Sequence, residues 1–278
     1  MIYNKQQRVY ALGDIHGKWQ IVRDFYLTNK IKEKFTKDTD VMILLGDAGL
    51  NYFFNYRDED TKKKLGKFPF TYFVIRGNHE ERPSVCAAKN PELWHTETFW
   101  GNTVYVENQF PHIKYALDEV SLYWIPYDDH KYYQTLVIPG AYSVDKYYRL
   151  QNGWSWFEGE QLTAAEMERG LDLIHCFDNE VDLVLSHTCP ILFEPTDLFL
   201  SFVDQNMVDK TMERYLGKIE YQLQYNTWLW GHYHATREYP RIEGQPYKKV
   251  MLYDKEALKV IDYLQEDYIN PYNFLSVK

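Results

Sequence analysis

Five short segments of this sequence each end an apolar, strand-like run with side chains that can bind a metal ion. Five of the nine histidines fall in these segments, whereas scattered core or surface histidines would not follow strand ends. Parallel strands bring their carboxyl ends to one edge of a sheet, so we expect an α/β fold that collects the segments at such an edge. In chain order they are Gly13-Asp14-Ile15-His16-Gly17, Gly46-Asp47-Ala48-Gly49, Gly77-Asn78-His79-Glu80, Ser186-His187-Thr188 and Gly231-His232-Tyr233-His234.

The first third of the chain predicts a βαβ unit followed by a further strand. Apolar residues spaced like Ile21 and Phe25 indicate a helix, and the continuous apolar run 41–45 indicates a buried strand. The expected elements are a strand at 8–12, a helix at 19–30, a strand at 40–45, a polar loop at 56–67 and a strand at 70–75.

The remainder of the chain predicts a second sheet and two more helices. Short runs that alternate apolar and polar residues are typical of antiparallel strands. Thr163 followed by Glu166 has the capping-box pattern that begins a helix. The absence of a repeat or a Gly/Ser linker favours one domain over residues 1–278. The expected elements are strands at 103–106 and 120–125, a helix at 163–177, a strand at 181–185, a helix at 208–223 and a strand at 227–230.

The composition is that of a folded globular protein, since hydrophobic residues make up 45% and charged residues 26% of the 278 residues. The 31 Lys and Arg against 40 Asp and Glu leave a formal net charge of -9. Such a surface repels a polyanion, which disfavours an extended nucleic acid as a partner without excluding it. A small site that carries bound cations can still take a phosphorylated substrate, either a small molecule or a phosphoprotein.

Nothing in the sequence indicates a membrane segment or an export signal. No apolar run approaches the roughly 18 residues of a transmembrane helix. The polar residues 1–8 lead directly into the first metal-competent segment, which leaves no room for a cleavable signal peptide. We therefore expect a cytoplasmic protein without a membrane partner, and its three cysteines, which form no CxxC pair, are expected to be reduced thiols.

The spacing of the metal-competent residues indicates a centre for divalent cations. Asp14 and His16 share one face of an extended segment, as do His232 and His234, so each pair can converge on a small volume. A carboxylate such as that of Asp47 can bridge two cations. Oxygen and imidazole ligands without thiolate favour manganese, iron, zinc or nickel over a cysteine-type zinc site. Two such cations can activate a water molecule and stabilise the charge of a phosphate.

The ordered set of motifs resembles that of the calcineurin-like metallophosphoesterases. Asp-x-His, Gly-Asp, Gly-Asn-His-Glu, a lone His and Gly-His-x-His occur here in that family's order, from position 13 to position 234. The resemblance implies a four-layer αββα sandwich of two mixed sheets flanked by helices. It also implies that a hydroxide bridging two metals, with manganese favoured, attacks a phosphate ester.

The resemblance further assigns roles to individual residues. His79 would give a proton to the leaving-group oxygen, a role that suits the near-neutral pKa of histidine. One metal would be held by Asp14, His16, Asp47 and His234, and the other by Asp47, Asn78, His187 and His232.

The second motif departs from the common form of that family. Leu50 and Asn51 stand where many members have an Asp that holds the catalytic His and an Arg that grips the phosphate. Those functions must then come from elsewhere or be weaker. We expect Arg149, which follows the strand at 137–138, to enter the site and contact the phosphate, with Arg76 and Arg82 as competitors.

The sequence favours a phosphomonoesterase that acts on a nucleotide or a phosphoprotein. A nuclease or a cyclic-nucleotide phosphodiesterase is the enzymatic alternative. A metal-bound binding module with weak turnover is the third hypothesis. It is motivated by Leu50 and Asn51, which replace the Asp and Arg common in the family. The aromatic segment that contains Trp154 is expected to pack between a sheet and a helix rather than to form a wall of the site.

Overall fold

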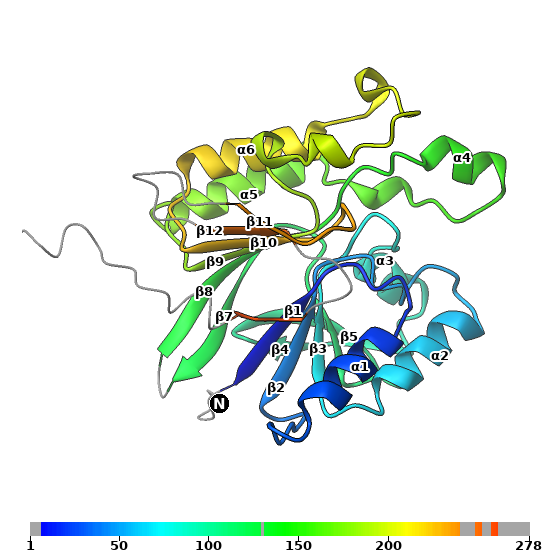
Figure 1. Cartoon of the computed structure of the whole chain (residues 1–278), viewed down its shortest axis with the longest axis vertical. Coiled ribbons are helices and arrows are strands. Elements are labelled where there is room, and N and C mark those ends of the chain that lie inside the picture. The colour runs from blue at the N-terminus through cyan, green and yellow to red at the C-terminus, as the bar shows by residue number, and fades with distance from the viewer. Residues whose placement is uncertain (1–6, 129–130, 240–247, 252–256, 261–278) are drawn as a thin grey trace, which may run out of the picture.

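Two sheets face each other in the computed structural model, which describes residues 7–128, 131–239, 248–251 and 257–260 (Figure 1). In the first sheet the strands β1, β2, β3 and β6 run parallel, and an antiparallel strand lies at each side of this group. The strand order of the first sheet is β13 (Leu258–Lys259), β1 (Arg8–Leu12), β2 (Asp40–Leu44), β3 (Thr71–Val74), β6 (Ile113–Tyr115), β5 (Asn102–Glu107) and β4 (Trp94–Phe99).

The second sheet is also mixed, with a parallel group formed by β12, β10, β9 and β8. Its order is β11 (Arg237–Tyr239), β12 (Lys248–Met251), β10 (Thr227–Trp230), β9 (Leu183–Ser186), β8 (Lys131–Ile138) and β7 (Ser121–Asp128). The antiparallel strands expected in the middle of the chain are divided between the sheets. The run at 103–106 lies in β5, which pairs with β4 and β6, so its assignment to the second sheet was wrong. Only the run at 120–125, in β7, belongs to the second sheet.

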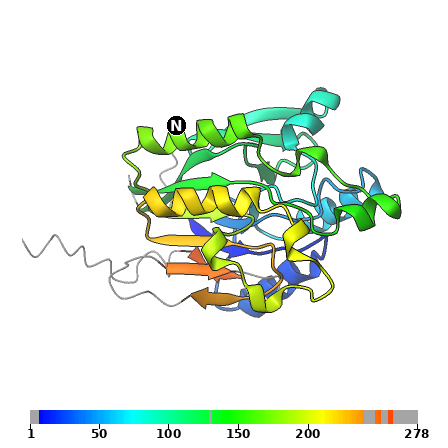
Figure 2. The ribbon, with the colours of Figure 1, turned by 90° about the horizontal axis from the view of Figure 1, so that it is seen from above.

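Apolar side chains fill the space between the sheets, and helices cover the two outer faces. Val41 and Phe73 of the first sheet share one buried cluster with Val137 and Leu229 of the second. Helices α1 (Gln20–Asn29) and α2 (Tyr56–Leu65) cover the first sheet, and α5 (Ala164–Cys176) and α6 (Thr211–Gln222) cover the second. Figure 2 shows α5 in green and α6 in yellow lying side by side above that sheet. The αββα sandwich is therefore confirmed.

Two short helices and several 3-10 turns lie in the connections. The helix α3 (Pro83–Lys89) begins with a proline, which lacks the N–H that the first turn leaves unpaired. The helix α4 (Lys146–Gln151) follows β8. The 3-10 turns are at Glu158–Glu160, Ile191–Phe193, Thr196–Leu198 and Gln205–Met207.

The polar stretch expected as a loop at 56–67 is instead the helix α2. Asn55 caps this helix by accepting the backbone N–H of Arg57 at 2.9 Å. The Asp58 carboxylate, in its first turn, accepts three backbone N–H groups from residues 52–54 and so ties the helix to the preceding loop. Few apolar residues are needed because Leu65 and the stem of Lys62 fill the buried face, which is why hydrophobic spacing failed to indicate a helix.

The long helices with strong sequence signals lie where they were expected. Thr163 caps α5 and receives the N–H of Glu166, whose carboxylate accepts the Thr163 N–H in return, so the capping box is present. The strand at 227–230 is β10 with the same bounds, and every one of its residues is buried. Its neighbour β9 runs parallel to it, and β8 runs parallel to β9, which places the segments after β9 and β10 beside each other.

Candidate active site

The five metal-competent segments meet where the carboxyl ends of the parallel strands of both sheets come together. Asp14 follows β1, Asp47 follows β2 and Asn78 follows β3, all in the first sheet. His187 follows β9 and His232 follows β10, both in the second sheet. Contacts across this edge join residues that are more than 200 positions apart in the sequence.

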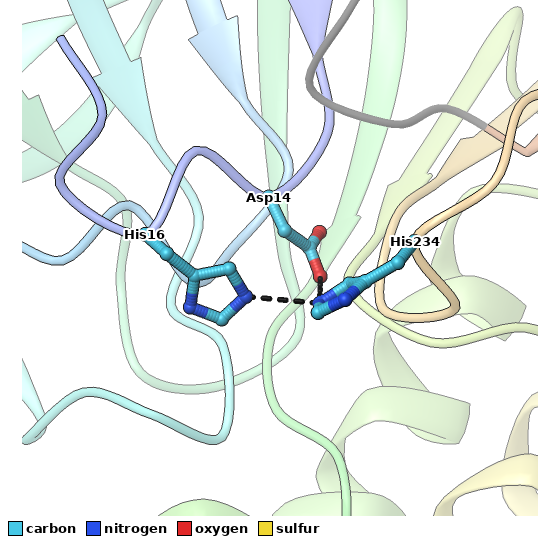
Figure 3. Close-up of side chains that lie close together, drawn as sticks. All are labelled: Asp14, His16 and His234. Atoms are coloured by element: carbon cyan, nitrogen blue, oxygen red, sulfur yellow. Dashed lines mark hydrogen bonds and ion pairs between the residues drawn. The ribbon is translucent and has the colours of Figure 1, made fainter. Parts of the chain in front are cut away.

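Asp14, His16 and His234 form one cluster of possible metal ligands (Figure 3). The Nε2 atoms of the two imidazoles lie 2.9 Å apart, and Nε2 of His234 lies 3.5 Å from Oδ2 of Asp14. The other oxygen of Asp14 accepts the backbone N–H of His232 at 2.9 Å. The buried carboxylate is therefore held from one side and presents its second oxygen to the imidazoles.

Asp47 lies at the centre of the whole group. Its Oδ2 is 3.9 Å from Nε2 of both His16 and His79, and its Oδ1 is 3.6 Å from Nε2 of His187. The backbone N–H of His79 donates to Oδ1 at 2.8 Å. One oxygen thus faces His16 and His79 and the other faces His187, an arrangement that suits a carboxylate shared by two cations.

Asn78 and His187 present two acceptor atoms to each other. The Asn78 amide donates to Oγ of Ser143 at 2.9 Å, and that hydroxyl donates to Glu160 at 2.5 Å, so Oδ1 of Asn78 points to His187. Nδ1 of His187 lies 2.7 Å from the carbonyl of Leu45, which can only accept a hydrogen bond. In neutral His187, Nε2 then carries a lone pair that faces Oδ1 of Asn78 at 2.9 Å. A cation at this point would satisfy both acceptors, so this donor set fits a divalent metal.

The backbone at the site is shaped for close approach. Four of the candidate ligands have a positive φ, a conformation that costs free energy for residues other than glycine and that concentrates at functional sites: His16 at 44°, Asp47 at 46°, His232 at 70° and His234 at 53°. A Cβ atom at Gly77 would lie 2.0 Å from Oδ1 of Asp47, and one at Gly231 would lie 2.2 Å from Oδ1 of Asp14. These two motif glycines let neighbouring strand ends reach the carboxylates.

The electrostatics of the cluster favour the ligand forms of its members. Burial and the neighbouring His187 lower the pKa of His232 to about 3, so this imidazole is neutral at pH 7. Burial alone would raise the pKa of Asp47, but the surrounding imidazoles, His79 foremost, lower it instead. A hydrogen bond with Asp14 raises the pKa of His234, so a proton competes with a cation there as the pH falls.

His79 lies at the edge of the cluster, against the side chain of Arg149. The pKa of His79 is lowered by burial and by this guanidinium, and Asp47 only partly offsets the effect. Arg149 comes from α4, and its Nε donates to Asp145 one turn earlier at 2.8 Å. Oδ1 of Asp145 lies 4.0 Å from Nε2 of His79. Asp145 was missed in the sequence, although its spacing of four residues from Arg149 is that of an ion pair on a helix.

The other arginine candidates are engaged away from the cluster. The guanidinium of Arg76 donates to the carbonyl of Glu160 at 2.8 Å, and that of Arg82 donates to the carboxylate of Glu166. Asn51 is buried and accepts a hydrogen bond from Lys62 at 3.0 Å, while Leu50 packs in the core beneath the first sheet. Positions 50 and 51 therefore contribute no charged group to the cluster, whereas Arg149 and Asp145 lie beside His79.

Two cavities flank the cluster and share His79 and Asp145 in their walls. One has a volume of about 500 Å³ and also contacts Asp47 and His232. The other, of about 400 Å³, contacts His16 and Arg149. Trp154 is half-exposed and lines the second cavity, so the expectation that it packs between a sheet and a helix was wrong.

A family model described as calcineurin-like phosphoesterase matches residues 7–236. The chain belongs to this family. The fold is shared with the structure of TT1561 from Thermus thermophilus, at 12% identity and a TM-score of 0.52 over 93% of this chain and 96% of that one. No curated protein matches the sequence of this calcineurin-like phosphoesterase.

Two further structures resemble this phosphoesterase at lower TM-scores. A dimetal phosphatase from Danio rerio has 10% identity and a TM-score of 0.49, over 90% of this chain and 88% of that one. The phosphopantetheinyl hydrolase PptH from Mycobacterium tuberculosis has 12% identity and a TM-score of 0.41, over 96% of this chain and 95% of that one. Among the described residues of the present protein, no helix has the length and apolar character required to cross a membrane.

Proposed function

We propose that this phosphoesterase uses two divalent cations, with manganese favoured, to hydrolyse a phosphate monoester of a nucleotide or a phosphoprotein. The observation that carries the proposal is the position of Asp47, whose two oxygens face two different groups of donors. Asp14, His16 and His234 would complete the first metal site, and Asn78, His187 and His232 the second. When bound, such cations activate a water molecule and neutralise charge on the phosphate.

His79 and Arg149 would act on the substrate itself. His79 borders both cavities, so its imidazole can reach the oxygen of a leaving group and donate a proton to it. Arg149 is held by Asp145 with a second hydrogen bond to the carbonyl of Ser155 at 3.2 Å. This support fixes the guanidinium beside His79, where it can bind the phosphate oxygens.

Removal of the metal tests the proposed function directly. The purified protein treated with a chelator and then dialysed should lose hydrolysis of p-nitrophenyl phosphate, and manganese should restore it. The same assay with bis-p-nitrophenyl phosphate separates the alternatives, because a diester cleaved far ahead of the monoester would indicate a nuclease or a phosphodiesterase. Retained metal with no turnover of either ester would instead indicate a binding module.

Arg149→Ala should lower kcat/KM by roughly tenfold to a hundredfold and leave the metal content unchanged, since a charge-assisted hydrogen bond contributes about 1.5 to 3 kcal/mol. Steady-state kinetics with elemental analysis of the same sample measure both quantities. Arg169→Ala is the matched control, because Arg169 is exposed and pairs with Glu119 outside the site. A well-folded Arg149→Ala protein with unchanged kinetics would remove Arg149 from the mechanism.

A further inference from the structure

The larger of the two cavities, here called the apolar cavity, lies directly beside the proposed metal centre. Asp47, His79 and His232 form part of its wall. The facing wall comes from the chain between β9 and α6, with Leu198, Phe199, Leu200, Val203 and Val208. Its volume of about 500 Å³ is far more than a phosphate group needs.

Aromatic contacts hold this wall in place. The ring of Phe199 stacks on that of Tyr233, with centroids 6.3 Å apart. Nζ of Lys210 lies 4.6 Å from the centroid of Phe199 and 2.6 Å from a carboxylate oxygen of Glu194. Lys210 is the single lysine or arginine among the described residues that line the cavity, and its charge is neutralised by this ion pair.

The remaining charges in the apolar cavity are unfavourable to an anion. Glu194 is paired with Lys210, and the carboxyl groups of Asp209 and Glu213 line the cavity in addition. Glu213 is buried and accepts the hydroxyl of Thr188 at 2.7 Å, and burial raises the pKa of Glu213 to about 7. A second phosphate placed here would meet carboxylates and, among the described lining residues, no lysine or arginine other than the paired Lys210, whereas an uncharged group would contact the apolar side chains of Leu198, Leu200 and Val203.

The smaller cavity is less acidic than the apolar cavity. Arg57 and Arg149 line it against two carboxylates, Asp58 and Asp145, together with the aromatic rings of Tyr52 and Trp154. Negative charge on a substrate is therefore accommodated on the side of these arginines, and the uncharged part is directed away from them. The two cavities together give a bound phosphate ester one orientation.

We propose that the apolar cavity binds the leaving group, and that the substrate is a phosphate ester of a bulky, apolar and uncharged alcohol. The proposal rests on the hydrolytic function proposed above and narrows its substrate class. In the reaction, a water oxygen forms a bond to phosphorus, the bond from phosphorus to the leaving oxygen breaks, and that oxygen takes up a proton from His79. The proton that the attacking water loses passes to solvent and replaces the one given up by His79, so the protons balance. The products are the free alcohol and inorganic phosphate. Nucleoside di- and triphosphates, whose leaving groups carry phosphate, are disfavoured.

A pair of aryl esters tests this substrate class. Phenyl phosphate and 2-naphthyl phosphate release phenols of similar acidity but different size. We expect kcat/KM to be roughly tenfold to a hundredfold higher for the naphthyl ester, because a second ring is buried in the cavity. ADP, hydrolysed at its terminal phosphate, should be slower than either ester. Equal kcat/KM for the two esters, or faster hydrolysis of ADP, would overturn the proposal.

Two variants locate the preference in the cavity. Leu200→Asp adds a charge to the apolar wall, and Val203→Trp fills part of the volume, so both should reduce the ratio between the naphthyl and phenyl esters. Leu192→Asp is the matched control, because Leu192 is 81% exposed and does not line the cavity. A ratio that stays unchanged in both cavity variants would show that the second ring binds elsewhere.

A binding measurement separates this proposal from the hydrolytic one. The non-hydrolysable benzylphosphonate and 2-naphthylmethylphosphonate can be titrated into the metal-loaded protein by calorimetry. Tighter binding of the naphthyl compound, weakened by Leu200→Asp, would support the cavity proposal even if the protein hydrolysed no ester. Absence of hydrolysis would then overturn only the hydrolytic proposal. Equal affinity of the two phosphonates overturns the cavity proposal whatever the activity.

Discussion

Asp47→Asn is expected to lose metal from both sites at once and to reduce kcat by roughly 10³-fold or more, on the scale of losses that follow removal of electrostatic stabilisation. The change removes one negative charge from a side chain that faces both groups of donors. Substitution of a ligand to only one cation would leave the other in place. Elemental analysis of the dialysed protein, combined with turnover of p-nitrophenyl phosphate, measures both effects.

The matched control for this prediction is Asp38→Asn, which removes the same charge from an exposed position outside the site. Its metal content and turnover should equal those of the unaltered protein. An Asp47→Asn protein that still held two tightly bound metals and remained active would show that Asp47 bridges nothing.

His79→Ala is expected to retain its metals and to lose activity by an amount that depends on the leaving group. Removal of a general acid typically costs about 10²-fold to 10⁴-fold. The loss should be severe for alkyl phosphates, whose leaving oxygen needs a proton, and milder for p-nitrophenyl phosphate, whose phenolate leaves unaided. Parallel kinetics on the two substrates and elemental analysis check the prediction.

His95→Ala serves as the control, because His95 is exposed and contacts Asn108 and Glu97 of its own hairpin, outside the site. Equal losses on both esters would mean that His79 stabilises phosphate charge rather than donating a proton. Loss of metal from the His79→Ala protein would instead show that His79 is a metal ligand. This outcome must be tested because Nε2 of His79 lies only 3.9 Å from Oδ2 of Asp47.

The sequence predicted the elements whose signals are local and strong. The capping box at Thr163 and the apolar spacing of α6 depend on residues within a few turns of each other, and the structure has both helices. The motifs at the strand ends also lie together, because parallel pairing brings β1, β2 and β3 to a common edge. The layering of the two sheets followed from the resemblance to a family and not from the pattern of residues.

The rest depended on contacts between distant parts of the chain. The polar helix α2 forms because Asp58 and Asn55 satisfy backbone groups, which hydrophobic periodicity does not register. The alternation of apolar and polar residues predicts that β5 is a strand, but it does not predict that β5 pairs with β6. The role of Asp145 and the apolar cavity likewise arise only when the loops after β8 and β9 meet above the cluster.

The division of the candidate ligands between the two sheets has a mechanical consequence. Asp14 and Asp47 are carried by the first sheet, whereas His187 and His234 are carried by the second. Cations bound by both groups of ligands would link the two sheets at the edge where the strand ends meet. At this edge the backbone at Gly77 and Gly231 packs closely against the carboxylates of Asp47 and Asp14. Bound metals would then hold the two sheets together at the same edge where they would serve the reaction. A chelator would therefore remove a contact between the sheets, the same contact that a mechanical force separating the sheets at this edge would break.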